Sequence, residues 1–334
     1  MTPAAHRARS LPALLAAALV LGLVAGLARP AGAMDPAEVV FEESTFEGFT
    51  VLTHMPDAPT ALLFLFHGSN GDERFARRFE NREILARLVP LGYGVVATAS
   101  TLREDPKRWA TQSVDPAENV DLARLGRLHA SLVADGTIRA GTPVFAMGMS
   151  NGAAFAGVFG MAAQALGLPV RALALYEGPL VRPVLAEIEA GRPLPPLFAV
   201  LAENDPLVRF EPQMSLFSKV AEAGYTVDLH IARERPFRVE DLSRLPEFGE
   251  AEAREIFDRL VSGGIIDADG KRLFSFEGEA RGLQDALDAA LDGVPGAGEV
   301  RNQLLIAWAS HKMRSDFAEA QVAFFETYRT VTDE

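Results

Sequence analysis

The stretch TPVFAMGMSNG, residues 142–152, decides the fold. Its apolar first half, Thr142–Met147, is typical of a β-strand, and Ala153–Leu166 continues with small and apolar residues at helical spacing. Between them lies G-x-S-x-G, whose glycines allow a strand and a helix to pass closely through a strained turn. Such a turn exposes the hydroxyl of Ser150, and the free N–H groups at the helix start, including that of Asn151, can stabilise an oxyanion. The stretch therefore predicts a serine nucleophile, the alternative being a glycine-rich turn with an incidental serine.

Short apolar runs and helical stretches alternate on both sides of this motif. Residues 61–66, ALLFLF, are apolar at every position, which is typical of a strand buried on both faces. Further strands are expected at Gly94–Ser100, Val170–Tyr176, Leu197–Ala202 and Thr226–Ile231, and an antiparallel hairpin turning at Gly48 is expected from Glu38–Phe46 and Phe49–Met55. Helical stretches such as Asn119–Ala134 separate them. The predicted fold class is α/β, with a mostly parallel, doubly wound sheet and functional loops at the carboxyl ends of its strands.

A second glycine-rich loop, His67-Gly68-Ser69-Asn70-Gly71, follows the ALLFLF strand. It can aim a backbone N–H at the site from the side opposite to that of Asn151, and two such donors make an oxyanion hole. We assign the second donor to Ser69 or its neighbour. His67 lies upstream of Ser150, and we expect it to shape the loop as a buried, hydrogen-bonded histidine.

Composition excludes several classes of protein. The chain has 334 residues, 49% of them hydrophobic and 23% charged, which fits a soluble globular protein with a sizeable core. With 32 Lys+Arg against 45 Asp+Glu, the formal charge of -13 opposes non-specific binding to nucleic acid. The chain has no cysteine, which excludes disulfides, cysteine-ligated metals and a thiol nucleophile. A covalent catalyst must therefore be an oxygen or nitrogen nucleophile.

Residues 1–33 have the pattern of a secretory signal. Arg7 and Arg9 precede an apolar run, Leu11–Ala28, and Ala31-Gly32-Ala33 supplies the small residues of a cleavage site. We expect cleavage after Ala33, which leaves a mature domain of residues 34–334 that is secreted or periplasmic and not held by a membrane. The alternative is an uncleaved anchor, because the run approaches a membrane-spanning length.

The loops H67-G68-S69-N70-G71 and G148-M149-S150-N151-G152 resemble those of the α/β-hydrolase superfamily. Within it they look like the loops of secreted esterases related to polyhydroxybutyrate depolymerases and feruloyl esterases. The resemblance covers about Glu38 to Asp205 and resumes near the C-terminus. It implies an α/β-hydrolase fold, ester hydrolysis without a metal or organic cofactor, and a chain order of serine, acid and histidine.

That order places the acid and the base downstream of Ser150. The turn A-E-N-D-P-L-V, residues 202–208, looks like the acid loop of the family and implies that Asp205 orients the histidine; Glu203 and Glu177 are the substitutes. His311 lies on the loop before the last helical stretch, where the superfamily keeps its general base. The other downstream histidine, His230, sits in an apolar strand pattern and is expected to be packing.

An insertion of about residues 233–298 separates the last predicted strand from His311. Its helical stretches, Glu250–Val261 and Gly282–Leu291, flank a hairpin-like stretch, Ile265–Phe274. The turn Asp267-Ala268-Asp269-Gly270-Lys271 lacks the later ligands of an EF-hand, so we expect a hairpin and no metal. The insertion is either a lid over the site or a decoration far from it. Trp109 is expected to line the same opening as a substrate-binding residue, or to pack on the surface.

The leading hypothesis is a secreted or periplasmic serine hydrolase that cleaves small-molecule or polymeric esters with Ser150, His311 and Asp205. The same three residues would serve a serine peptidase or amidase. A non-catalytic binding protein on the hydrolase scaffold is the hypothesis from another class. Nothing in the sequence indicates the oligomeric state.

Overall fold

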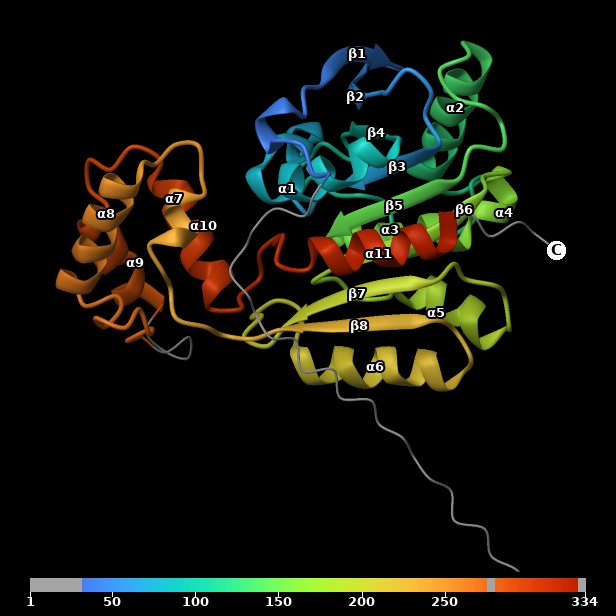
Figure 1. Ribbon diagram of the computed structural model, residues 1–334. Coiled ribbons are helices and arrows are strands. Elements are labelled where there is room, and N and C mark those ends of the chain that lie inside the picture. Colours follow the sequence, from blue (N-terminus) through green and yellow to red (C-terminus); the bar gives the residue numbers. More distant parts are fainter. Residues whose placement is uncertain (1–31, 275–279, 330–334) are drawn as a thin grey trace, which may run out of the picture. The chain divides into compact units, whose positions relative to one another are not determined.

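The computed structural model describes residues 32–274 and 280–329. Eight strands form one sheet in the order β1-β2-β4-β3-β5-β6-β7-β8 (Figure 1). β2 pairs antiparallel with β1 and β4, and the other neighbours are parallel. The strands are β1 Glu42–Phe46, β2 Phe49–His54, β3 Ala61–Phe66, β4 Tyr93–Thr98, β5 Val144–Met149, β6 Val170–Tyr176, β7 Leu197–Ala202 and β8 Val227–Ala232. The predicted fold class, a mostly parallel doubly wound sheet, is confirmed.

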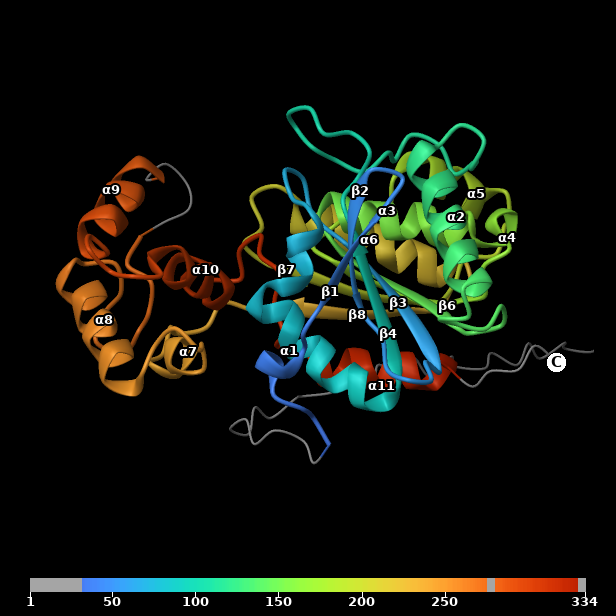
Figure 2. The same ribbon diagram turned by 90° about the horizontal axis from the view of Figure 1, so that it is seen from above.

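Helices cover both faces of the sheet, as Figure 2 shows. Leu125, Phe155 and Phe217 of α2, α3 and α6 belong to the core on one face, and Ile84 and Phe325 of α1 and α11 to the core on the other. The helices outside the insertion are α1 Phe79–Leu88, α2 Val120–Ala134, α3 Asn151–Met161, α4 Ala163–Leu166, α5 Arg182–Glu189, α6 Phe210–Glu222 and α11 Ala318–Arg329, with short 3-10 helices η1 Pro36–Glu38, η2 Glu73–Arg77 and η3 Val89–Leu91. Burial on both faces explains why β3 is apolar throughout.

The first hairpin forms as predicted but is shorter at its start. Glu47 and Gly48 both have positive φ, 49° and 81°, as a tight hairpin turn requires. The expected strand from Glu38 begins only at Glu42. Glu38 is instead the last residue of η1, which Asp35 caps by accepting a hydrogen bond from the N–H of Ala37 at 2.9 Å, and residues 39–41 link η1 to β1.

The insertion between β8 and α11 is helical and has its own hydrophobic core (orange to red in Figure 1). Its helices are α7 Glu240–Ser243, α8 Glu250–Ser262, α9 Ala280–Ala290 and α10 Ala297–Ala307. The buried residues Phe237, Leu260, Ile265 and Trp308 pack together in this core. The expected hairpin forms around a bridge between Ile266 and Arg272.

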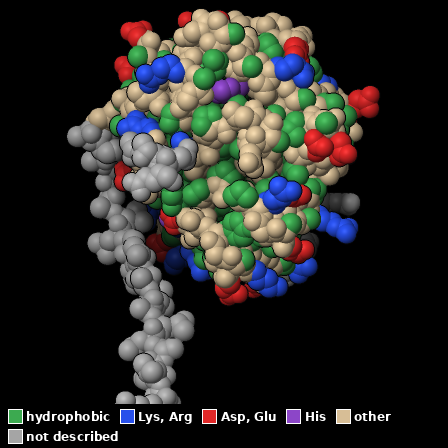
Figure 3. Space-filling model, turned by 90° about the vertical axis from the view of Figure 1, so that its right-hand side faces the viewer, with side chains coloured by type: hydrophobic (Ala, Val, Ile, Leu, Met, Phe, Trp, Pro, Cys, Tyr) green, Lys and Arg blue, Asp and Glu red, His purple; other side chains and the backbone are tan. Residues whose placement is uncertain are grey.

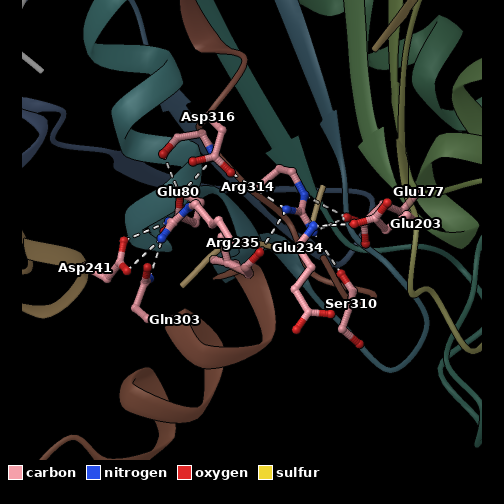
Figure 4. Close-up of polar contacts among 12 residues, drawn as sticks. Glu80, Glu177, Glu203, Glu234, Arg235, Asp241, Gln303, Ser310, Arg314 and Asp316 are labelled. Carbon is pink, nitrogen blue, oxygen red and sulfur yellow. Dashed lines mark hydrogen bonds and ion pairs between the residues drawn. The ribbon is translucent and has the colours of Figure 1, made fainter. Parts of the chain in front are cut away.

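A buried carboxylate on α1 ties the insertion to the rest of the chain (Figure 4). Glu80 accepts hydrogen bonds at 2.8 Å from Arg244, which follows α7, and from Gln303 of α10, and at 2.9 Å from the backbone N–H of Ser315. Three segments far apart in the sequence therefore meet at one side chain, next to the loop that carries His311.

On the face shown in Figure 3, positively and negatively charged side chains are interspersed with apolar ones.

The signal predicted at residues 1–33 falls almost entirely on residues 1–31, which lie outside the described residues. Within the described ranges, no helix combines the length and the apolar character needed to cross a membrane.

Candidate active site

Ser150 occupies a strained turn between β5 and α3. Its φ and ψ of 59° and -120° are unusual for a residue with a side chain. A β-carbon at position 148 would lie 2.2 Å from the carbonyl oxygen of Gly152, and one at position 152 would lie 2.2 Å from that of Phe66. Both glycines of the motif are therefore required by close backbone packing, and this packing holds Ser150 in its strained conformation.

Asp205 and His311, 106 residues apart in the chain, are in direct contact. Asp205 follows β7, and its Oδ2 lies 2.6 Å from Nδ1 of the His311 ring. Its other oxygen accepts the N–H groups of Leu207 and Val208, each at 2.8 Å. The carboxylate is thus fixed by the turn that carries it, and it holds the ring with Nε2 directed away from Asp205 and available to another group.

Ser150, Glu177 and Asp205 follow three neighbouring strands, β5, β6 and β7, at the carboxyl edge of the sheet. The N–H of Ser150 donates to the carbonyl of Tyr176, the last residue of β6, at 2.9 Å. In the described part of the chain, the Ser150 hydroxyl makes no hydrogen bond to the His311 ring. A bond of this kind often tightens only when a substrate is bound.

Glu177, one of the two substitute acids, lies behind the histidine. Its Oε2 is 3.8 Å from Nδ1 of His311, while its Oε1 accepts a hydrogen bond from Arg314 at 2.9 Å. Burial raises the pKa of Glu177 to about 7, against the opposing effect of Arg314. Glu203, the other substitute, pairs with Arg233 at 2.8 Å. Of the three acids, Asp205 alone makes a hydrogen bond to His311.

Arg314 is a site residue that the sequence did not reveal (Figure 4). Its buried guanidinium donates to the carbonyls of Ile306 and Ser310, at 3.1 and 2.9 Å, and it pairs with Glu177 at 2.8 Å. These bonds fix the chain on both sides of His311. In the sequence Arg314 stands in a polar run, KMRSD, that looks solvent-exposed, and no local signal marks it as buried.

The loop between β3 and η2 passes beside the serine. A β-carbon on Gly68 would lie 3.5 Å from the β-carbon of Ser150. The predicted donors, the N–H groups of Ser69 and Asn151, have no hydrogen-bond acceptor among the described residues. Asn70, in the left-handed region at φ 62°, ties the loop down by donating its N–H to the carbonyl of Lys107 at 2.7 Å.

His67 braces this loop from inside the protein, as expected. The N–H of Ser100 donates to Nε2 of His67 at 3.0 Å, so the ring proton is on Nδ1, which lies 2.7 Å from the carbonyl of Gly68. Burial lowers the pKa of His67 to about 4. The ring is therefore neutral at pH 7 and serves as a structural link.

Trp109 lies in the core, a position that differs from both expectations. Its side chain is 0% exposed, and its ring lies 4.7 Å, between centroids, from that of Phe155. The indole N–H donates to the carbonyl of His67 at 3.0 Å, and the backbone N–H donates to Oδ1 of Asn151 at 2.7 Å. Trp109 packs inward against the aromatic cluster around Phe155, so it connects the two segments that are predicted to form the oxyanion hole and lines no opening.

His230 packs on the sheet, as its strand pattern predicted. Its ring centroid lies 4.4 Å from that of Phe198 and 5.3 Å from that of Phe317. Its Nε2 lies 3.1 Å from a carboxylate oxygen of Asp228 on the same strand. It is therefore a packing residue of β8.

Glu177, Asp205 and His311 are also the one group of potential metal ligands found among the described residues, with ligand atoms within 4.8 Å of one another. The guanidinium of Arg314 already neutralises Glu177, and both oxygens of Asp205 are engaged. A cation there would face a fixed positive charge. The arrangement suits an imidazole that gains and loses a proton better than a bound metal.

No family model and no curated protein sequence matches the chain. Among solved structures, a protein of Thermus thermophilus is 17% identical, with a TM-score of 0.46 over 88% of this chain and 99% of the other. Carboxylesterases from Bacillus cereus and Mesorhizobium loti are each 17% identical, with TM-scores of 0.42 and 0.41; the matches cover 55% and 66% of this chain and 85% and 98% of the others. At such identities the chemistry has to be derived from this chain's own side chains. The strand order, with the sharp Ser150 turn after β5, shows that the chain has the α/β-hydrolase fold.

Proposed function

We propose that this protein is a serine hydrolase that cleaves carboxylic esters, with Ser150 as nucleophile, His311 as general base and Asp205 as its orienting acid. The observation that carries the proposal is the 2.6 Å contact between Asp205 and His311, because it joins distant segments at the sheet edge that also carries the strained Ser150 turn. A binding module has no need of an imidazole held in this way.

The chemistry follows from these positions. His311 takes the proton of Ser150 while the serine oxygen attacks the ester carbonyl, and the N–H groups of Ser69 and Asn151 stabilise the resulting oxyanion. The C–O bond to the alcohol breaks as His311 returns the proton to the leaving oxygen. Water then gives a proton to His311 and attacks the acyl-enzyme, and the acid departs as Ser150 regains its proton.

The more specific parts of the proposal rest on sequence. The two glycine-rich loops resemble those of secreted esterases related to polyhydroxybutyrate depolymerases and feruloyl esterases, which supports the same kind of activity here. The pattern of residues 1–33 supports export to the periplasm or the medium. Expression of the full chain in a bacterial host, followed by N-terminal sequencing of the exported protein, tests the second part. A mature chain beginning at Met34 is expected, and a full-length chain in the membrane fraction would contradict it.

A fluorophosphonate probe tests the nucleophile directly. We expect covalent labelling of the wild type, with the modified peptide containing Ser150, and no labelling of Ser150→Ala. Ser113→Ala, which removes a hydroxyl bonded to Glu118 on an exposed loop, is the matched control and should label normally. An unlabelled wild-type protein, with its fold verified by circular dichroism, would favour a binding protein instead.

Ester and amide cleavage are separated by p-nitrophenyl esters of graded acyl length beside the matching anilides. We expect turnover of the esters and little of the anilides. Faster cleavage of the anilides would identify an amidase or peptidase with the same catalytic residues.

A further inference from the structure

A cavity of about 500 Å³ opens beside His311, between the insertion and the acid loop. Leu283 and Leu287 of α9, Leu304 and Leu305 of α10, and Leu207 of the acid loop supply most of its apolar wall. This volume is in the range of pockets that enclose small organic ligands. The insertion therefore forms one wall of a pocket whose other wall carries the general base.

Two cations line the same cavity, and they differ in their partners. Arg301 of α10 is neutralised by Asp288 of α9 at 2.5 Å. Lys312, which directly follows His311, is half-buried and has no ion pair or hydrogen bond to any other described residue. Lys312 is thus the cation of the pocket that has no ion-pair partner among the described residues.

The charged groups around Lys312 are engaged elsewhere or have the same sign. Burial lowers the pKa of Lys312, and the next largest effect, from Arg78 at the start of α1, lowers it further. Glu299 and Glu177 act in the opposite direction, but Glu299 bonds to Asn302 and Glu177 pairs with Arg314. A partly buried ammonium that has no ion-pair partner among the described residues costs free energy, which an anionic ligand would recover. Although the chain has 45 acidic residues, none of the described ones forms an ion pair with Lys312.

We propose that the substrate is an aliphatic ester that also carries a free carboxylate, with its hydrocarbon chain against the leucines and its carboxylate on Lys312. This proposal rests on the proposed ester hydrolysis and adds the substrate class. The carboxylate belongs either to the acyl part, as in a monoester of a dicarboxylic acid, or to the alcohol part, as in an ester of a hydroxy acid. Lys312 recognises the same group in both cases, and His311, the proposed general base, lines the same cavity.

The test compares matched anionic and neutral esters. For the acyl side we would use the mono-p-nitrophenyl ester of octanedioic acid against p-nitrophenyl octanoate; for the alcohol side, the hexanoyl ester of 6-hydroxyhexanoic acid against hexyl hexanoate, followed by pH-stat. Wild type should favour the anionic member of at least one pair by about tenfold or more in kcat/KM, because a hydrogen bond to a charged group is stronger than one between neutral groups. The side that shows the preference identifies which part of the substrate carries the carboxylate.

Lys312→Gln should abolish that preference by lowering kcat/KM for the anionic ester about tenfold more than for its neutral counterpart, because the neutral ester makes no charge contact with Lys312. Lys271→Gln, at an exposed lysine 3.8 Å from Asp269, is the matched control and should keep the preference. The preference should also weaken as salt is raised. An equal loss on neutral and anionic esters in Lys312→Gln, or no preference in wild type, would overturn the proposal.

Failure of this proposal is distinguishable from failure of ester hydrolysis itself. Calorimetry with octanedioate and the Ser150→Ala protein measures the carboxylate site without turnover, and binding should weaken about tenfold when Lys312→Gln is added. Hydrolysis of neutral esters with no octanedioate binding would reject the substrate class alone. Absence of both probe labelling and ester hydrolysis would reject the function, and the binding result would still decide the site.

Discussion

Ser150 is held by backbone packing, whereas His311 is held by side chains from distant parts of the chain. Around the serine, Gly148 and Gly152 leave no room for a β-carbon between β5, α3 and the end of β3. Around the histidine, the contacts come from Asp205 after β7 and from Arg314, which bonds to Glu177 after β6. The proposed nucleophile is thus fixed by a local motif, and the proposed base is fixed by polar contacts between residues more than a hundred positions apart.

The difference matters because the two kinds of support fail differently. A backbone turn tolerates almost no added volume, so a change there disturbs folding as well as chemistry. A polar clamp can lose one bond and leave the sheet intact, while the catalytic group moves by a fraction of an ångström. Substitutions on the two sides should therefore separate stability from catalysis.

The largest expected effect on catalysis comes from removing the proposed base, His311, or the proposed acid, Asp205. His311→Ala should lower kcat for a p-nitrophenyl ester by about 10³–10⁶-fold, and Asp205→Asn by about 10⁴-fold, because the ring loses the carboxylate that fixes its tautomer. Steady-state kinetics on proteins with wild-type circular dichroism measure both. His230→Ala is the control, since that ring packs on Phe198 of the sheet, and its kcat should stay near that of wild type. Activity that survives in His311→Ala and disappears in His230→Ala would move the base to β8.

The second-largest expected effect is on the free energy of unfolding, and it comes from the tight backbone packing at Gly152. Gly152→Ala places a β-carbon 2.2 Å from the carbonyl oxygen of Phe66, and neither backbone can yield without moving β3 or α3. We expect a loss of more than about 3 kcal/mol in the free energy of unfolding, or no soluble protein. Gly141→Ala, where an added β-carbon meets nothing within 4 Å, should change the free energy of unfolding by less than about 1 kcal/mol in urea titrations. Equal stability of the two variants would mean that the turn relaxes freely.

The contribution of His67 to the free energy of unfolding, through its contacts in the loop after β3, should depend on pH. Its folded pKa of about 4 lies below the ordinary value of 6.5, so the unfolded chain binds the extra proton between these values. The contribution of neutral His67 to the free energy of unfolding is complete above pH 6.5. It is lost as the pH falls toward 4, by about 3 kcal/mol in total. Glu177 works in the opposite sense: with its pKa raised to about 7, it stabilises the fold less as the pH rises from 4.5 to 7.

The pH profile of wild type alone therefore mixes the two contributions. Urea unfolding at pH 7 and pH 4.5 of wild type and His67→Gln isolates the histidine, because Glu177 is common to both proteins. The wild type should lose about 2–3 kcal/mol more than the variant between the two pH values. Parallel losses in the two proteins would show that His67 titrates equally in the folded and unfolded states.

The sequence predicts the features that depend on local spacing, such as the Ser150 turn, better than those that depend on contacts between distant residues, such as the surroundings of His311. The Ser150 turn, the His67 loop and the buried strand β3 are readable because short-range spacing and glycine placement encode them. Asp205 and His311 were inferred from a family resemblance, since nothing in their own neighbourhoods connects them. Arg314 and Trp109 were missed or misplaced because a buried arginine and a core tryptophan look locally like surface residues, and their burial depends on partners such as Glu177 and Phe155.

The smallest effect concerns a positioning residue, Asn204, in the acid turn. Its amide donates to Oε2 of Glu234 at 2.8 Å and to the carbonyl of Trp308 at 3.0 Å, which ties the acid loop to the end of α10, close to His311. Asn204→Ala should lower kcat by about 10–100-fold with little change in KM, because the Asp205–His311 pair loses part of its alignment. Asn302→Ala removes an amide bonded only to Glu299 of the same helix, and it should leave kcat unchanged. If Asn204→Ala and Asn302→Ala have the same kcat, the contacts of Asp205 and Arg314 suffice to hold His311 in position. The hydrogen bonds of Asn204 would then contribute nothing to its alignment.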